Sequence, residues 1–389
     1  MDEEERVIPA KRRLQPGQRV RAIIVDDSAV LRQLVVRTLE RDHDIEVVAS
    51  APNGPVAIDR IAKLQPDVVS LDLELPDMSG LDTLRNIRRN FPDIRVVMFS
   101  SQTERGAAST FEALSLGADD YVTKFGSAES GNLGAGLASK IKQFFVFPSE
   151  LSAPPLPSMK DLPAPVDPCA ANPRCSIECP KVILIGISTG GPEALTAVLP
   201  QIPADFQLPI LIVQHMPPLF TRFLCDRLQD VSKLPVREAR HGEKLDSPKI
   251  LLAPGDFHMR LAPPASGSLP GILLDQGPLE NSCRPAADAL FRSAAQILGG
   301  AALAIVMTGM GQDGLRGAAA LKAVGAFVIA QDESSSAVWG MPRAVVEAGL
   351  ADLVVPLKRI VPAMLNRVLL LSRAENSQPK DKSIAVVKS

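Results

Sequence analysis

Two stretches of the chain alternate short apolar segments with segments of helical periodicity, and this alternation limits the possible folds more than any other feature. In the first stretch, the expected strands are 20–25, 46–50, 68–71, 96–100 and 120–123. In the second stretch, they are 181–186, 209–214, 249–253, 302–307 and 326–330. Strands of this kind alternating with helices are typical of parallel sheets covered by helices on both faces. The sequence therefore predicts an α/β protein with two doubly wound parallel-sheet domains.

Proline is concentrated between these two stretches. Residues 148–180 hold nine of the 34 prolines and show little apolar periodicity, a composition typical of a semi-extended linker. Cys169, Cys175 and Cys179 lie in this segment at a spacing that matches no common zinc module, so we interpret them as incidental thiols. We expect domains over 20–147 and 181–374, a linker over 148–180, and mobile tails at 1–19 and 375–389.

Charge and composition exclude several classes of protein. The chain of 389 residues carries 42 basic and 44 acidic residues, and this balance provides no electrostatic footprint for nucleic acid. The acidic start, MDEEER, does not resemble a secretory signal. The uncharged run 293–312 contains four glycines, so we interpret it as a helix end, a turn and a buried strand rather than a membrane span. Five cysteines in a long chain favour reduced thiols. We expect a cytoplasmic protein without membrane insertion.

Polar side chains follow several expected strands of the first domain. They are Asp26 and Asp27, Asp72, Ser100, and Lys124. In an open parallel sheet, the carboxyl ends of the strands form the ligand-binding edge. Converging carboxylates repel one another unless a cation lies among them, and Mg²⁺ prefers such oxygen ligands. The set predicts a phosphoryl group carried on one carboxylate and contacted by the lysine and the hydroxyl. For a single residue, an N-cap role for Asp27 or Ser28 is the alternative.

Four motifs in this domain, VDDSAVLR, LDLELPDMSGLD, VVMFSS and GADDYVTK, resemble the receiver domain of two-component response regulators, which has a flavodoxin-like fold. The resemblance implies that Asp72 is the phosphoacceptor and that Lys124 contacts the phosphoryl group. It implies a Mg²⁺ site made by Asp26, Asp27, Asp72 and the backbone carbonyl of Glu74. It further implies that Ser100 and Tyr121 are the switch residues. Phe125 stands where receivers usually have proline, a departure that bears on the geometry of this turn.

The second domain opens with a candidate nucleophile. Ser188 lies in the G-x-S-x-G pentapeptide 186–190 between an apolar strand and a helix, a turn that exposes the hydroxyl above the sheet. A phosphate-binding glycine loop is the weaker alternative because its further glycine and lysine positions are missing. His215 directly follows the next strand, and Asp313 follows a later one. These residues predict a Ser–His–Asp set, with the acid orienting the histidine. The chain order differs from that of α/β-hydrolases.

Further motifs, GISTGG, VQHMPP, CRPAADALFRSAA, MTGMGQDG and QDESSSAVWGMP, resemble the catalytic domain of chemotaxis protein-glutamate methylesterases, the CheB family, a Rossmann-like α/β domain. The resemblance implies hydrolysis of γ-glutamyl methyl esters on chemoreceptors, release of methanol, and deamidation of receptor glutamines, without a cofactor for ester hydrolysis. Ser188 would be the nucleophile, His215 the base and Asp313 its orienter. The backbone N–H of Met310, with Thr189 nearby, would hold the oxyanion, and Arg284 would shape the substrate cleft.

The resemblance also implies a mode of regulation and a set of partners. The unphosphorylated receiver would pack over the esterase cleft, and phosphorylation would loosen it. The long linker predicts inhibition that is weaker than usual. We expect methyl-accepting chemotaxis receptors as substrate, a chemotaxis histidine kinase as phosphodonor, no nucleic acid partner, and a monomer. Two alternatives stay open, namely a phosphorylation-controlled binding or scaffold module with a lapsed active site, and an esterase for another ester or amide.

Overall fold

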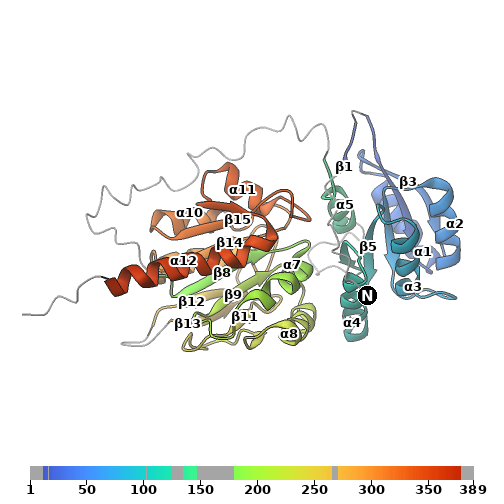
Figure 1. Cartoon of the computed structure of the whole chain (residues 1–389). Helices are drawn as coiled ribbons and strands as arrows, with labels where there is room; N and C mark the ends of the chain where they lie inside the picture. The colour runs from blue at the N-terminus through green and yellow to red at the C-terminus, as the bar shows by residue number, and fades with distance from the viewer. Residues whose placement is uncertain are drawn as a thin grey trace, which may run out of the picture.

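Two parallel sheets, each flanked by helices, organise the computed structural model of the chain (Figure 1). It describes residues 12–15, 17–101, 103–124, 135–146, 179–264 and 270–377. Phe125, Cys169, Cys175 and almost all of the predicted linker lie outside these residues. We call the described residues up to 146 the N-terminal unit and those from 179 onward the C-terminal unit.

The N-terminal unit contains a five-stranded parallel sheet. Its strands are β2 (Val20–Val25), β3 (Ile45–Ala51), β4 (Val68–Asp72), β5 (Arg95–Ser100) and β6 (Asp120–Thr123), in the order β3-β2-β4-β5-β6. The helices are α1 (Ala29–Leu39), α2 (Gly54–Leu64), α3 (Gly80–Asn90), α4 (Glu104–Ser115) and α5 (Ala135–Lys142). Because β2 pairs with both β3 and β4, the order reverses at β2. In open α/β sheets, ligands bind beyond the strand ends at such a switch point.

Side-chain caps fix where several of these helices begin. The hydroxyl of Ser28 accepts a hydrogen bond from the Leu31 N–H at the start of α1. Asn53 and Ser79 cap α2 and α3 in the same way. Such caps satisfy N–H groups that the first helical turn leaves without partners. Ser28 is therefore the cap after β2, and the carboxylate of Asp27 is left to the edge of the sheet.

The C-terminal unit contains a seven-stranded parallel sheet. Its strands are β8 (Val182–Ile187), β9 (Ile210–Gln214), β10 (Val236–Glu238), β11 (Ile250–Leu252), β14 (Ala302–Val306), β15 (Phe327–Gln331) and β16 (Leu353–Val355), in the order β10-β11-β9-β8-β14-β15-β16. β8 pairs with β9 on one side and with β14 on the other, so this sheet also has a switch point at its first strand. The two predicted parallel sheets are confirmed.

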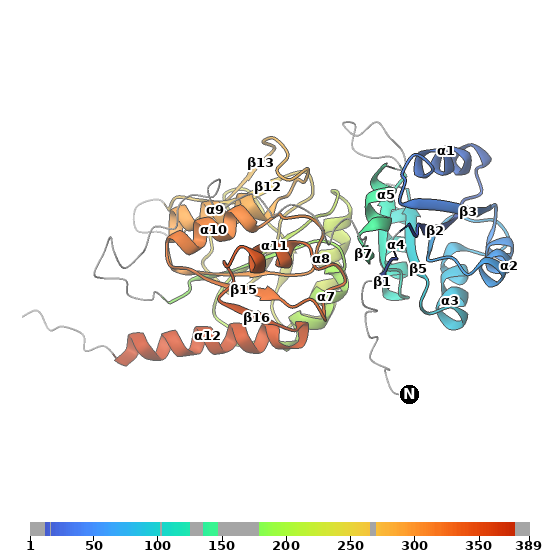
Figure 2. The ribbon, with the colours of Figure 1, turned by 90° about the horizontal axis from the view of Figure 1, so that it is seen from above.

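Helices cover both faces of this second sheet (Figure 2). They are α7 (Gly191–Val198), α8 (Phe220–Val231), α9 (Ala287–Leu298), α10 (Leu315–Ala323), α11 (Met341–Glu347) and α12 (Leu357–Ser377), with a 3-10 turn at Leu199–Gln201. An antiparallel hairpin, β12 (His258–Ala262) with β13 (Gly271–Asp275), packs against α9 and was not predicted. The run 293–312 forms the end of α9 and then β14, as predicted. None of the helices in the described ranges is long and apolar enough to span a membrane.

Regular secondary structure lies within both segments that were predicted as tails. The short strand β1 (Arg12–Arg13) falls within the predicted tail 1–19, and it pairs in parallel with β7 (Phe145–Val146). Leu14, next to it, is buried. At the other end, α12 continues to Ser377 rather than stopping at 374. A two-residue strand is held by backbone hydrogen bonds, which leave no apolar periodicity in the sequence. The domain and linker boundaries themselves stay predictions.

The two units meet along α4, β6 and α5 of the N-terminal unit and α7 and α8 of the C-terminal unit (Figures 1 and 2). Arg227 on α8 donates a hydrogen bond to the Phe111 carbonyl oxygen on α4, at 3.1 Å, and another to the Ser115 hydroxyl. The Phe111 ring lies 6.1 Å from the ring of Phe220. Aromatic and polar contacts therefore join α4 to α8.

Candidate active site and phosphorylation site

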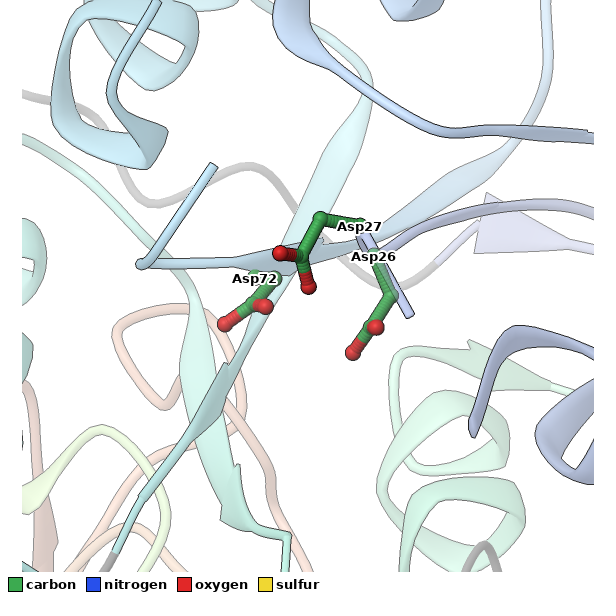
Figure 3. A group of neighbouring side chains, drawn as sticks. All are labelled: Asp26, Asp27 and Asp72. Carbon is green, nitrogen blue, oxygen red and sulfur yellow. The ribbon is translucent and has the colours of Figure 1, made fainter. Parts of the chain in front are cut away.

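Three carboxylates gather at the switch point of the first sheet (Figure 3). Asp26 and Asp27 directly follow β2, and Asp72 is the last residue of β4. One carboxylate oxygen from each lies within 4.8 Å of the others. Asp26 and Asp72 are buried, whereas Asp27 is exposed. The parallel register of β2 and β4 thus brings together residues more than forty positions apart in the sequence.

Lys124 lies against two of these carboxylates. Its Nζ is 2.5 Å from Asp72 Oδ2 and 3.1 Å from Asp26 Oδ2. Burial raises the pKa of Asp72 to about 6, and the charge of Asp26 adds to this, while Lys124 acts in the opposite direction. The pKa of Lys124 is raised because its two carboxylate partners outweigh the effect of its burial. Asp72 and Lys124 therefore form a charge-assisted pair in the resting site.

The donor set fits a divalent cation. Asp26 Oδ2 is buried, and the Lys124 ammonium lies 3.1 Å from it. Three carboxylate oxygens around one point match the hard oxygen ligands that Mg²⁺ prefers. The N–H of Glu74 donates to Asp72 Oδ1 at 3.2 Å, so the backbone of this residue lies beside the cluster.

The two predicted switch residues lie on neighbouring strands and face other partners. Ser100 ends β5 and is buried, donating to the Gly106 carbonyl oxygen and accepting from the Thr110 hydroxyl at 2.7 Å. Tyr121 on β6 is buried against the C-terminal unit, where its ring stacks on Phe220. In this structure Ser100 is thus bonded to α4 and Tyr121 contacts α8.

Ser188 lies at the switch point of the second sheet, directly after β8. Its N–H donates to the Thr308 carbonyl oxygen beyond β14, and its own carbonyl oxygen accepts from the Gly191 N–H. Gly190, the N-cap of α7, has a φ of 76°, a conformation that side-chain-bearing residues rarely adopt. This glycine lets the chain turn from strand to helix within two residues, with Ser188 at the N-terminal end of α7.

His215 and Asp313 form a buried pair. His215 directly follows β9, and its Nε2 lies 2.7 Å from Asp313 Oδ2. Asp313 also accepts from the backbone N–H of Ala287 at 2.6 Å and from the amide of Asn281 at 2.9 Å. Burial raises the pKa of Asp313, but His215 and the backbone N–H groups of Asp288 and Ala287 outweigh it, so its pKa is lowered. The carboxylate is thus fixed in place and kept ionised.

The other ring nitrogen of His215 faces a cysteine. The Sγ of Cys283 lies 3.6 Å from Nδ1. Burial acts to lower the pKa of His215, but the charges of Cys283 and Asp313 and the hydrogen bonds to both raise it to about 10. Within the part of the chain that the structure describes, no hydrogen bond joins Ser188 to His215. Neither Asn281 nor Cys283 was predicted as a site residue, although Cys283 directly precedes the predicted Arg284 and Asn281 lies three residues before it.

The remaining predicted residues of this site have different surroundings. Arg284 is paired with Asp256 and donates to the Gly277 carbonyl oxygen at 2.8 Å, contacts that join three loops. Met310 is 45% exposed on the loop after β14. Thr189 is buried, and its hydroxyl is hydrogen-bonded to the N-terminal unit.

A cavity of about 220 Å³ lies between the two units. The C-terminal unit contributes Ser188, Thr189 and His215 to its lining, and the N-terminal unit contributes Tyr121 and Lys140. The candidate nucleophile therefore faces a space that the N-terminal unit covers.

A polar network closes one side of this contact. The Thr189 hydroxyl donates to Gln143 Oε1 at 3.0 Å and accepts from Lys140 Nζ at 3.2 Å. Asp120 Oδ2 accepts from the same two side chains, at 2.9 Å from Gln143 Nε2 and 2.6 Å from Lys140 Nζ. We call these four residues the Thr189 network. It ties the residue next to Ser188 to α5 and β6.

Comparison with known proteins identifies the family of each domain. Residues 22–130 match the response regulator receiver domain, and residues 183–364 match the CheB methylesterase family. The two folds and their sites thus define a response regulator whose output domain is a hydrolase. The chain belongs to the protein-glutamate methylesterase/protein-glutamine glutaminase family, as its full-length relatives show. The predicted fold class, family and enzyme class are confirmed.

Two of these relatives extend over most of the chain. The protein-glutamate methylesterase/protein-glutamine glutaminase of Trichodesmium erythraeum is 42% identical over 354 residues, covering 90% of this chain and 99% of the relative. Protein-glutamate methylesterase/protein-glutamine glutaminase 2 of Caulobacter vibrioides is 45% identical over 350 residues, with coverages of 90% and 99%. The crystal structure of the Thermotoga maritima CheB methylesterase catalytic domain is 41% identical and covers 48% of this chain and 98% of that chain, with a TM-score of 0.47.

Proposed function

We propose that the protein hydrolyses γ-glutamyl methyl esters on methyl-accepting chemotaxis receptors, and deamidates receptor glutamines, under control of a chemotaxis histidine kinase. The observation that carries this proposal is Ser188 at the switch point of the catalytic sheet, in one cavity with His215 and beneath the receiver. We further propose that it acts as a monomer, since the residues of both sites come from one chain, and that it works in the cytoplasm.

The reaction is acyl transfer to a serine. Ser188 Oγ attacks the glutamyl carbonyl, and His215 accepts its proton. Because Nε2 is bonded to Asp313, the accepting nitrogen is Nδ1. The ionised Asp313 orients the ring and stabilises the imidazolium. The backbone N–H of Met310 holds the oxyanion, with Thr189 beside it. Methanol or ammonia then leaves, and water hydrolyses the acyl-enzyme.

Phosphorylation uses the carboxylate cluster of the receiver. Asp72 is the phosphoacceptor, and Asp26, Asp27, Asp72 and the backbone carbonyl of Glu74 would hold Mg²⁺. When bound there, Mg²⁺ would supply positive charge against the phosphoryl oxygens. Lys124, now paired with Asp72, would turn to the phosphoryl group. The Ser100 hydroxyl would leave its α4 partners for the same group. Both moves alter α4, β6 and their contacts with the catalytic domain.

Regulation follows from the position of the receiver. The Thr189 network holds a substrate-site side chain, and the stacked Tyr121 lines the cavity of Ser188. A substrate helix therefore needs the receiver to move away. Phosphorylation changes the charge at Asp72 and biases this two-state contact toward the open form.

The test is methanol release from methylated receptor, with wild type and Ser188→Ala, each with and without a small acyl phosphate donor and Mg²⁺. We expect release by the wild type, an increase with the donor, and none by Ser188→Ala in either condition. Wild-type release no faster than that of the variant would instead favour a scaffold with a lapsed active site. Release that is unchanged by the donor would reject the proposed regulation alone.

A further inference from the structure

The imidazole of His215 is held between two side chains. Asp313 contacts Nε2 at 2.7 Å, and the thiol of Cys283 contacts Nδ1 at 3.6 Å. Cys283 belongs to the segment just before α9, and Asn281 in the same segment donates to Asp313. One short segment thus supports both the base and its carboxylate partner.

The side of the ring that Cys283 contacts is the one the reaction uses. Asp313 is fixed by backbone and side-chain N–H donors and occupies Nε2. Only Nδ1 is therefore left to accept the proton of Ser188. The half-buried thiol of Cys283 lies at that nitrogen.

We propose that Cys283 is a positioning residue for the catalytic base: its thiol holds the Nδ1 side of His215 and sets the pH range over which this nitrogen accepts a proton. The inference rests on the proposed function. In the resting site, contacts on both sides of the ring fix its rotation. Cys283 gives way at Nδ1 when Ser188 transfers its proton, and a negative charge on the sulfur stabilises the protonated ring that results.

The charged groups around His215 indicate the direction of the effect. Asp313 and Cys283 contact the ring directly, and Asp288 lies behind Asp313 through Asn281. Across the cavity are Glu193 on α7 and, from the receiver, Asp119, Asp120 and Lys140. The charge of Cys283 is the largest of the influences that raise the pKa of His215 against its burial. Removing the thiol therefore lowers that pKa while Asp313 and the cavity groups stay in place.

The test compares Cys283→Ala and Cys283→Ser in the full chain by the pH dependence of kcat/KM for methanol release. In Cys283→Ala we expect the acid limb to move to lower pH by about one unit and kcat on the plateau to fall about 2- to 10-fold, as the loss of one hydrogen bond predicts. Serine can still hydrogen-bond to Nδ1 but lacks the charge by which Cys283 raises the pKa of His215. Cys283→Ser should therefore restore kcat while its acid limb moves like that of alanine.

Cys179→Ala is the matched control, since it removes a half-buried thiol at the end of the predicted linker, and it should keep the wild-type profile. The imidazole of His215 should also be titrated by NMR in Ser188→Ala with and without Cys283→Ala, a readout that does not depend on esterase activity. We expect a lower midpoint without the thiol. The proposal would be overturned if Cys283→Ala kept the wild-type acid limb and kcat, or if its NMR midpoint were unchanged. It would also be overturned if Cys179→Ala showed the same shift.

Discussion

Tyr121 of the receiver and Phe220 of the catalytic domain stack across the domain boundary, with ring centroids 4.7 Å apart and planes 1° from parallel. Both side chains are buried. Tyr121 is also the aromatic switch residue that the resemblance to receiver domains implies. The residue predicted to respond to phosphorylation is therefore itself a contact with the enzyme that it regulates.

Replacing Phe220 with leucine should raise the activity of the unphosphorylated protein. Leucine keeps an apolar side chain on α8 but removes the stack on Tyr121, and such aromatic pairs contribute about 0.5–1.5 kcal/mol beyond their buried area. We expect methanol release without phosphodonor to rise about 2- to 10-fold. Phe327→Leu is the control. Phe327 lies on β15 rather than on α7 or α8, and its ring packs under Arg367 of the same domain. Equal rates for the two variants would show that the stack does not hold the closed form.

Replacing Gln143 with glutamate should open the Thr189 network. The Nε2 group of Gln143 now donates to Asp120 Oδ2 at 2.9 Å, so a carboxylate there would face a carboxylate. The hydrogen bond to Asp120 is lost and a repulsion is added, although a glutamate oxygen can still accept from the Thr189 hydroxyl. We therefore expect a basal rate higher by about tenfold or more. The rate is measured on the unphosphorylated full chain. Gln33→Glu makes the same charge change on the exposed face of α1 and should leave the rate as it is. The prediction fails if Gln143→Glu behaves like Gln33→Glu.

The activity should rise with pH across the neutral range. Protonated His215 cannot accept the proton of Ser188, and a raised pKa means that the protonated form persists to higher pH. The acid limb of kcat/KM should therefore lie above the ordinary histidine value of about 6.5, toward the value of about 10 that the closed structure favours. Kinetics at pH values from roughly 6 to 9 measure this limb. A rate that is flat over that range would contradict His215 as the base.

Replacing Asp72 with asparagine should abolish phosphorylation and leave the basal esterase intact. The amide keeps the shape of the side chain but lacks the nucleophilic carboxylate and one negative charge of the cluster. Incorporation of radioactive phosphoryl groups from a kinase or acyl phosphate should disappear, as it should in the wild type when Mg²⁺ is chelated. Asp59→Asn, at an exposed ion pair with Lys63, should retain full incorporation. Labelling of Asp72→Asn at the wild-type level would place the phosphoacceptor elsewhere.

Much of the fold and the placement of the main site residues could be predicted from the sequence. Strands such as β4 and β14 are buried along their whole length, so they leave continuous apolar runs that mark their positions. Once the strands are parallel, residues that directly follow them must share one edge of the sheet. Asp26 and Asp72 meet for this reason.

Contacts from segments without periodicity could not be predicted. Cys283 lies between the β12–β13 hairpin and α9, and only tertiary packing brings it to His215. The hairpin itself interrupts the alternation of strand and helix, and the edge strands β10 and β16 are too short to leave a pattern. Arg284 was expected at the substrate cleft, but its polar contacts are with Asp256 and a loop carbonyl oxygen. The pairing of Gln143 with Thr189 depends on how the two domains pack, which neither domain's pattern reveals.

The cover over Ser188 is a single surface made of α4, β6 and α5. Two partners cannot occupy the same surface at the same time. Any molecule that binds this face of the receiver must therefore displace the esterase from it, and by reciprocity the esterase weakens the binding of that molecule. Such a competitor would be an activator of the enzyme without touching its active site, and its potency would measure the free energy that keeps the two domains together.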